Sequence, residues 1–130
     1  MLDDRTVTRA ERDGQVALVW TVPSNRFGWT SYVGHPPGEE EQRPYAVPAR
    51  REDLRGLAPA WISVGTADLF YQDDRDYARR LKDADVDCEL ITVPGAHHGA
   101  ELFKPDHPAI RKVQRARVEA MRRALRAPTP

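Results

Sequence analysis

The chain has 130 residues, with 20 Lys and Arg side chains against 20 Asp and Glu, so its formal net charge is zero. This length suits one domain. A zero balance excludes a whole-protein electrostatic attraction to nucleic acid or to anionic membranes, because both need a surplus of cations near phosphate groups.

The N-terminal residues and the cysteine content indicate a cellular compartment. The chain starts MLDDR, with acids where an export signal carries cations, and no apolar segment follows. Its longest apolar run, Val16 to Trp20, is too short to span a bilayer. Cys88 is the only cysteine, which excludes an internal disulfide and a cysteine zinc cage. We therefore expect a cytoplasmic protein with no membrane span.

Residues 1–56 contain many Pro and Gly residues, which predicts mostly loop and short helix. Within this part, Val16–Val22 is predicted to be a short strand, and Ser24 to be the N-cap of a short helix. That helix would carry Phe27, Trp29, Tyr32 and Val33. The acidic run Glu39–Glu41 is interpreted as a solvated loop tip.

Residues 57–130 have a more regular pattern, which predicts strand, helix, strand, helix. Trp61–Val64 is a short apolar run before Gly65, typical of a strand buried on both faces. An amphipathic helix follows, with its charged side chains mostly on the outer surface. Its apolar stripe consists of Phe70, Tyr77, Ala78, Leu81 and Ala84. Val86–Val93 is the second predicted strand, because it is rich in β-branched residues and is followed by Pro94-Gly95.

A final helix is predicted to begin near Pro108 and to end near Leu125, with Asp106 available as its cap. Its apolar arc would contain Ile110, Val113, Ala120, Met121, Ala124 and Leu125. The alternation of elements implies a parallel βαβ crossover. Two strands bury little core, and a stable sheet normally needs about three or more. The chain is therefore interpreted as a single partial α/β domain, residues 1–130, with an incomplete sheet.

Catalytic groups of doubly wound folds lie on loops at the carboxyl ends of strands. Here those loops are GTADLF and PGAHHG, and their candidates are Asp68 and His98. Neighbouring parallel strands would place the two loops side by side, so that a carboxylate could orient an imidazole base. Alternatively, Asp68 is a cap or turn former and His98 a loop histidine bonded to backbone.

At these residues the sequence resembles a known family. The blocks GTADLF, DRDYARRL and VDCELITVPGAHHG look like the C-terminal half of hormone-sensitive-lipase-like carboxylesterases, the α/β-hydrolase fold-3 group. Further blocks, SNRFGWTSY and YAVPARREDLRGLAPAWISVG, extend the resemblance over nearly the whole chain. The resemblance implies a Ser-His-Asp triad with Asp68 as the acid and His98 as the base. It also implies that His97 is a neighbour without a catalytic role, an ester substrate, and no metal or organic cofactor.

This fold places its serine before the acid in chain order, within a G-x-S-x-G turn. The serines of this chain are Ser24, Ser31 and Ser63, and none has that context; no HGG-type oxyanion loop occurs either. We therefore expect that the chain begins after the segments that attack the ester and hold the oxyanion, and that it is inactive alone. The chain differs from the family pattern at two further positions. Ala100 stands where the family commonly has an aromatic residue, and Asp85 stands where it commonly has Gly in a left-handed helix cap.

A second interpretation is that the chain is a non-catalytic association module or a truncated relic of the enzyme. The resemblance implies that Val86–Val93 lies at the sheet edge, and an exposed edge favours pairing with another chain. We therefore expect a homodimer through this edge and the last helix, or a complex with a separately made N-terminal half.

A metal site and a nucleic-acid interface have less support in the sequence. A metal site among His35, His97, His98 and His107 is disfavoured, because the adjacent His97 and His98 would point apart and no carboxylate lies at helical spacing. The final helix is basic but has no stacking aromatic residues and no known DNA-binding pattern, so we expect no nucleic-acid partner.

Overall fold

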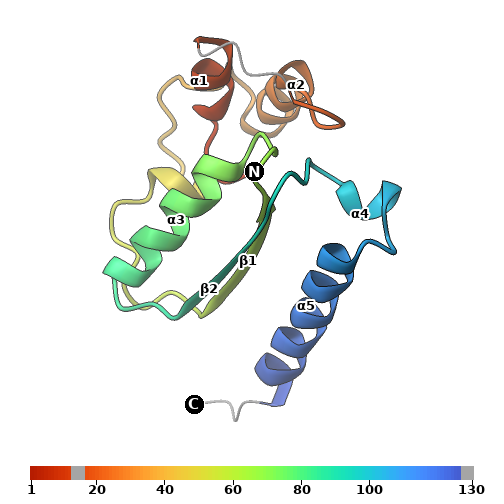
Figure 1. The fold of residues 1–130 in the computed structure, drawn as a ribbon. Coiled ribbons are helices and arrows are strands. Elements are labelled where there is room, and N and C mark those ends of the chain that lie inside the picture. The colour runs from red at the N-terminus through yellow and green to blue at the C-terminus, as the bar shows by residue number, and fades with distance from the viewer. Residues whose placement is uncertain (13–16, 127–130) are drawn as a thin grey trace.

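Two helices in the first half of the chain are followed by alternating strands and helices in the second half (Figure 1). The computed structural model describes residues 1–12 and 17–126. In chain order the elements are α1 (Thr6–Arg12), α2 (Val22–Val33), a 3-10 turn η1 (Pro48–Arg50), β1 (Ala60–Gly65), α3 (Tyr71–Asp83), β2 (Cys88–Val93), α4 (Ala100–Phe103) and α5 (Pro108–Arg126).

The segment before α2 is irregular, so the predicted strand Val16–Val22 is wrong. Residues 17–21 form neither strand nor helix, and Val16 lies outside the described residues. Val22 instead begins α2. Pro23 favours the helix, because its fixed φ suits the first turn and its missing N–H would have no intrahelical partner there.

The N-cap of α2 is Thr21 rather than the predicted Ser24. The Thr21 hydroxyl accepts a hydrogen bond from the Ser24 backbone N–H over 3.3 Å. Thr21 is itself extended, as an N-cap residue must be. Ser24 lies in the first turn of the helix, where its N–H needs the partner that Thr21 supplies.

β1 and β2 pair in parallel, with α3 on one face of the pair and α5 on the other (Figure 1). The register runs from Ala60 opposite Cys88 to Gly65 opposite Val93. On the α5 side, Val93 packs against Ile110. The predicted parallel βαβ unit and the following helix are therefore confirmed, whereas the one-turn helix α4 was not predicted.

Within the described residues the sheet has two strands, which confirms the incomplete sheet. β1 is less buried than predicted: Val64 and Gly65 are buried, but Ser63 is exposed. A strand is fully buried only when helices cover both faces along its whole length and strands flank both edges. Among the described residues β1 has one neighbouring strand, so the prediction of burial on both faces is wrong.

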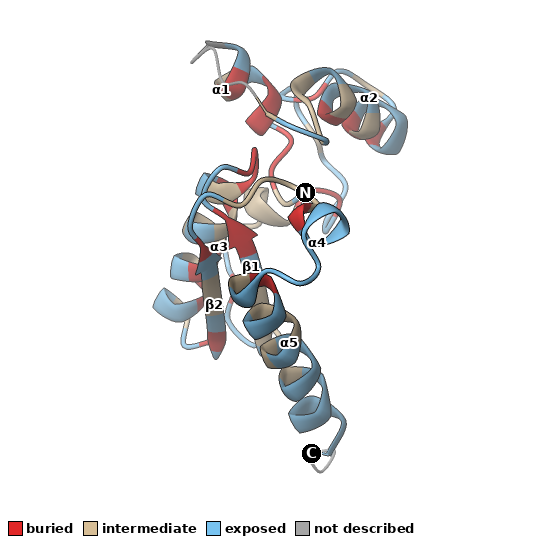
Figure 2. Ribbon diagram, turned by 45° about the vertical axis from the view of Figure 1, so that its right-hand side comes forward, coloured by how far each residue is buried: buried red, intermediate tan, exposed pale blue. Residues whose placement is uncertain are grey.

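The apolar core is divided into small clusters. One lies between α3 and the sheet and contains Leu54, Ala78, Leu81, Val86 and Cys88. Another lies between α1 and α2 and contains Val7, Trp29, Val33, Ala46 and Val47. Figure 2 shows the buried residues concentrated in these layers, while the second half of α5 is largely exposed.

Buried carboxylates join the N-terminal segment to the rest of the chain. Asp4 is fully buried and binds the Arg50 guanidinium with both oxygens. Asp73 at the start of α3 is 4% exposed and binds Thr6 and Arg9 of α1. The prediction that the charged residues of this helix lie on its outer surface is therefore wrong for Asp73, because α1 covers it.

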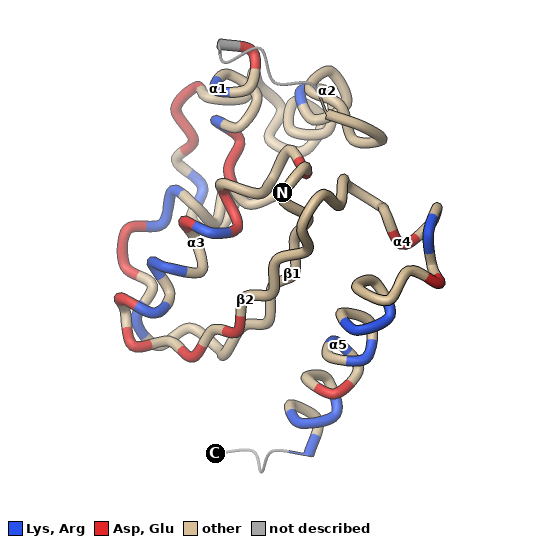
Figure 3. Tube along the Cα trace, viewed as in Figure 1, with Lys and Arg blue, Asp and Glu red and all other residues tan. Residues whose placement is uncertain are grey.

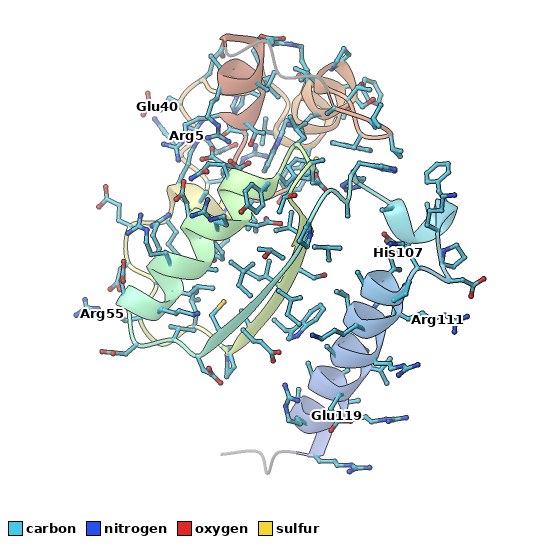
Figure 4. All side chains as sticks on the ribbon, viewed as in Figure 1. Arg5, Glu40, Arg55, His107, Arg111 and Glu119 are labelled. Atoms are coloured by element: carbon cyan, nitrogen blue, oxygen red, sulfur yellow. The ribbon has the colours of Figure 1, made fainter. Side chains whose placement is uncertain are left out.

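The acidic run Glu39–Glu41 is solvated only in part. Glu40, labelled in Figure 4, is exposed. The Glu41 side chain is only 5% exposed and accepts hydrogen bonds from Arg43 and from His35 Nε2, the latter over 3.2 Å. The prediction of a solvated loop tip is therefore wrong for Glu41, because these contacts draw its carboxylate towards the protein.

The start of α5 differs from its prediction in the capping residue. His107 precedes the helix, and its Nδ1 accepts a hydrogen bond from the Ala109 backbone N–H over 3.3 Å. Asp106 is exposed and instead binds the guanidinium of Arg111 (Figure 4 labels His107 and Arg111). His107 therefore serves the capping role expected of Asp106.

Asp85 adopts the left-handed conformation expected for the residue after α3, with φ of 57°. Left-handed backbone costs an ordinary L-residue about 1 kcal/mol or more, and Gly avoids this cost. Asp85→Gly is therefore expected to raise the free energy of unfolding by about 0.5–1 kcal/mol, measured by urea denaturation. Asp83→Gly, at the end of the helix itself, serves as the control and should lower it. A lower unfolding free energy for Asp85→Gly would contradict this interpretation.

Candidate functional site

Asp68 lies in the loop after β1 and is held there by backbone contacts. Its N–H donates to the carbonyl of Gly65 over 3.1 Å, and its own carbonyl accepts from Tyr71 N–H over 3.2 Å. Oδ1 of the side chain accepts from Phe70 N–H over 3.0 Å. The residue is only 8% exposed, so one carboxylate oxygen is fixed by the loop and the other, Oδ2, is available to a second group.

His98 lies in the loop after β2 and supplies that second group. Its Nδ1 is 3.1 Å from Asp68 Oδ2. An ionised carboxylate can only accept, so Nδ1 carries the hydrogen, and in the neutral imidazole Nε2 then keeps its lone pair. The two residues that the sequence singled out are thus brought together at the carboxyl ends of adjacent parallel strands. A neutral imidazole in this tautomer is arranged to take a proton at Nε2.

Backbone contacts between the two loops fix this geometry. Ala67 N–H donates to the carbonyl of Ala96 over 3.0 Å, and Gly95 N–H donates to Thr66 Oγ1 over 2.8 Å. The carbonyl of Ala96 lies so close to Gly65 that a Cβ added there would overlap it. Gly65 therefore allows a close approach between strand and loop that any side chain would prevent. The sequence alone indicated only that Gly65 ends a strand, and it did not indicate this close approach.

Two aromatic rings lie against the His98 imidazole. Phe70 meets it edge to face, with ring centroids 5.6 Å apart and an interplanar angle of 77°. Trp20 approaches at 6.0 Å and 41°. Phe70 was predicted only as an apolar helix residue, and Trp20 only as part of a short strand. Nothing in the local sequence signals either contact, because both depend on how distant segments pack.

His97, next to His98 in the chain, makes contacts of its own. His97 directs Nδ1 to the backbone carbonyl of His98 over 2.8 Å, and its ring lies 5.7 Å from that of Phe103. Among residues 1–12 and 17–126, no group of three or more His, Cys, Asp or Glu side chains is placed to hold a metal ion. No helix in that same part of the chain is long and apolar enough to cross a membrane.

A cleft of about 170 Å³ extends from the pair between β1 and α5. Asp68 and His98 line it together with Ser63 of β1 and with Gln114 and Arg117 of α5. Ser63 is thus the serine that shares this cleft, whereas Ser24 and Ser31 lie on α2. Among the described residues, no hydrogen bond joins a serine side chain to His98.

Asp74, in the first turn of α3, is a further carboxyl group, whose charge interacts with that of Asp68. Burial and the neighbouring Asp73 and Asp68 raise the pKa of Asp74 to about 7 from its ordinary 3.8. The folded chain therefore binds more protons at this group than the unfolded chain between about pH 4 and pH 7. The stabilising contribution of Asp74 is present below pH 4 and is lost as pH rises through the folded-state pKa.

Asp74→Asn removes this titrating group. We therefore expect the free energy of unfolding to decrease less between about pH 5 and pH 8 in this variant than in wild type. Urea denaturation at the two pH values measures the change. Asp87→Asn, at an exposed aspartate, is the control and should keep the wild-type pH dependence. Equal pH dependence in wild type and Asp74→Asn would show that the group does not titrate in this range.

Comparisons with known proteins agree on one family. A family model described as alpha/beta hydrolase fold matches residues 1–102. Among solved structures, a bacterial heroin esterase is 30% identical with a TM-score of 0.83, covering 98% of this chain and 41% of that one. Esterase LipW from Mycobacterium marinum is 28% identical with a TM-score of 0.82, covering 98% and 39%.

No curated protein sequence matches the chain. The chain spans about two fifths of the length of the two esterases. The family model and both structures cover the two parallel strands and the loops that carry Asp68 and His98. The chain belongs to the α/β-hydrolase fold family, in its fold-3, esterase-like group.

Proposed function

We propose that His98 and Asp68 are the base and the acid of a Ser-His-Asp site that hydrolyses carboxylic esters. The hydrogen bond of 3.1 Å between His98 Nδ1 and Asp68 Oδ2 is the observation that carries this proposal. Both similar structures are described as esterases, which supports an ester as the substrate.

In this mechanism His98 moves one proton and Asp68 holds the ring. Nε2 of His98 takes the proton of a serine hydroxyl as its oxygen attacks the ester carbonyl. The imidazolium then returns the proton to the leaving alcohol, and the acyl group remains on the serine until water removes it. Asp68 keeps Nδ1 protonated and stabilises the imidazolium. The bond from Phe70 N–H to Oδ1 limits the orientations of the Asp68 carboxylate.

We propose that the chain by itself lacks the serine that this mechanism needs and does not hydrolyse esters alone. Ser63 lines the same cleft, but it lies within β1 rather than on the strand-to-helix turn that exposes a nucleophile in this fold. Ser24 and Ser31 belong to α2. An attacking serine must lie within hydrogen-bond reach of the base, and no serine bond to His98 is present among the described residues.

Hydrolysis of p-nitrophenyl butyrate by the purified chain tests this part of the proposal, with a fluorophosphonate probe for an activated serine. We expect no turnover above buffer and no labelling, in a sample whose circular dichroism shows helix and strand. Turnover lost in both His98→Ala and Asp68→Ala, together with labelling, would instead show that one of the three serines acts as the nucleophile.

Association with a second copy is another candidate function. Within the described residues β2 has a free outer edge, and α5 carries three exposed apolar side chains at helical spacing. Val118 is 43%, Met121 58% and Leu125 83% exposed. Figure 3 shows that the rest of α5 is rich in Lys and Arg, so the apolar stripe stands out from its surroundings. Exposed strand edges and apolar stripes both favour pairing.

Light scattering at micromolar concentration tests whether two copies associate through this edge and α5. A dimeric mass that becomes monomeric in Leu125→Glu would support the proposal. Arg126→Glu, which changes charge beside the stripe without removing apolar surface, is the control. A monomeric mass for the wild-type chain counts against it.

A further inference from the structure

The short segment between α1 and α2 contains a strained turn. Trp20 N–H donates to the carbonyl of Leu18 over 2.8 Å, and Val19 between them has φ of 68°. This pattern is a γ-turn of the rare type with positive φ. A β-branched residue seldom adopts such a conformation, and it persists only where the surrounding structure imposes it. The turn therefore points to a contact that holds it in place.

The turn leads directly into Trp20, whose indole is held by neighbouring elements. Its Nε1–H donates to Oδ1 of Asn25 over 3.2 Å, and Asn25 is fully buried in α2. A Cβ added at Gly28 would lie 3.4 Å from Cζ2 of the indole, so the ring passes close to the backbone of α2. The ring also packs in an apolar cluster with Ala10, Leu69 and Phe70.

The same turn contacts the loop that carries His98 at two points. The Trp20 ring lies 6.0 Å from the imidazole. Val19 lies beside Gly99, the next residue, since a Cβ added there would be 3.7 Å from Val19 Cγ1. Trp20 thus joins the helical N-terminal part of the chain to His98.

One hydrogen bond to Asp68 does not by itself fix the His98 ring. The side chain is 39% exposed, and the torsion that turns an imidazole about its Cβ–Cγ bond is broad. Rotation about this bond would take Nδ1 away from the carboxylate. Phe70 and Trp20 are rings that lie against the imidazole and limit this rotation.

We propose that Trp20 is a positioning residue, which holds the His98 imidazole with Nδ1 towards Asp68 and leaves Nε2 for the reacting group. The strained turn at Val19 places the indole, and Asn25 fixes its orientation. The catalytic meaning of this role rests on the proposed function of the pair. The orientation itself is a property of the folded chain and can be measured without hydrolysis.

The test compares Trp20→Leu with the wild-type 130-residue chain. Leu keeps apolar contacts with Ala10 and Leu69 but removes the ring and its N–H. Trp20→Phe keeps a ring against the imidazole, and Phe27→Leu is the matched control, because Phe27 is 75% exposed on α2. Two readouts are made at about pH 8, where histidines of ordinary pKa are neutral. These are the carbethoxylation rate of each histidine by mass spectrometry and the imidazole nitrogen signals of His98 by NMR.

In wild type we expect a single His98 tautomer with the hydrogen on Nδ1. Trp20→Leu is expected to average the two tautomers and to raise the carbethoxylation rate of His98 about three- to tenfold. The rates of His35 and His107 should not change. Trp20→Phe should lie between wild type and Trp20→Leu, because it keeps a ring but loses the hydrogen bond to Asn25. Phe27→Leu should equal wild type. Circular dichroism verifies that each variant is folded.

Unchanged His98 signals and rate in folded Trp20→Leu would overturn the proposal. The proposal would also fail if His98 reacted as fast in Trp20→Phe as in Trp20→Leu, or if its rate rose equally in Phe27→Leu. Either result would show that the substitution loosens the fold in general and that the ring at position 20 does not act on His98. These outcomes are separate from the proposed function, whose failure would appear in a chimera that supplies the nucleophilic serine, as ester hydrolysis that does not depend on His98.

Discussion

Gly65→Ala is expected to separate Asp68 from His98 and to lower the free energy of unfolding by about 1–3 kcal/mol or more, as overpacking does. The added Cβ would overlap the carbonyl of Ala96, which is backbone and cannot turn aside. The loop after β2 must therefore move away from β1. This movement breaks the bond of 3.0 Å between Ala67 N–H and Ala96 and carries His98 away from its partner.

Urea denaturation measures the stability change, and the His98 nitrogen signals by NMR report the loss of the Asp68 contact. Gly56→Ala is the control. Gly56 has φ of +73°, but nothing lies within 4 Å of an added Cβ, so this variant has backbone strain without steric overlap and should leave the His98 signals unchanged. Wild-type stability and wild-type His98 signals in Gly65→Ala would contradict the close approach.

Asp4→Ala is expected to lower the free energy of unfolding by about 3–5 kcal/mol, the usual range when one partner of a buried ion pair is removed. Both Asp4 oxygens bind Arg50, at 2.9 and 2.6 Å, and Oδ2 also accepts Gly38 N–H over 2.6 Å. The Arg50 side chain is only 22% exposed, so its charge would be left largely buried and unpaired.

Such a loss is a large part of the stability of a small domain, about 5–15 kcal/mol, so Asp4→Ala should shift the urea midpoint strongly. Asp53→Ala is the matched control, because Asp53 pairs with Arg55 in the same bidentate way but both side chains are exposed. Exposed pairs contribute little, and this variant should remain close to wild type. Similar shifts for the two variants would show that burial of the Asp4 pair does not matter.

The second half of the chain could be predicted from sequence because its signals are local. Trp61–Val64 and Val86–Val93 are short apolar runs ended by glycine or Pro-Gly, and the helix between them has a clear apolar stripe. Parallel pairing then follows from the length and handedness of the crossover. The same reasoning placed Asp68 and His98 on neighbouring loops, where the structure brings their side chains to 3.1 Å.

The first half was harder to predict because its signals are ambiguous. Thr21 and Ser24 are both good N-cap residues, and the apolar run ending at Trp20 fits a strand as well as an irregular segment. Which structure forms depends on packing with distant residues: Trp20 packs in a cluster with Ala10 and Phe70. The burial of Asp73 under α1 has the same cause.

We propose that His98 and Asp68 supply the base and the acid of an esterase site, and one experiment can decide this assignment. It is tested most directly in a chimera that joins residues 1–130 to the part of the bacterial heroin esterase that this chain does not cover. The measurement is kcat for p-nitrophenyl butyrate, with fluorophosphonate labelling of the serine. His98→Ala is expected to lower kcat about 10⁴-fold or more and to abolish labelling, while His97→Ala leaves both near their starting values. Full hydrolysis by the His98→Ala chimera would contradict the assignment of these two residues.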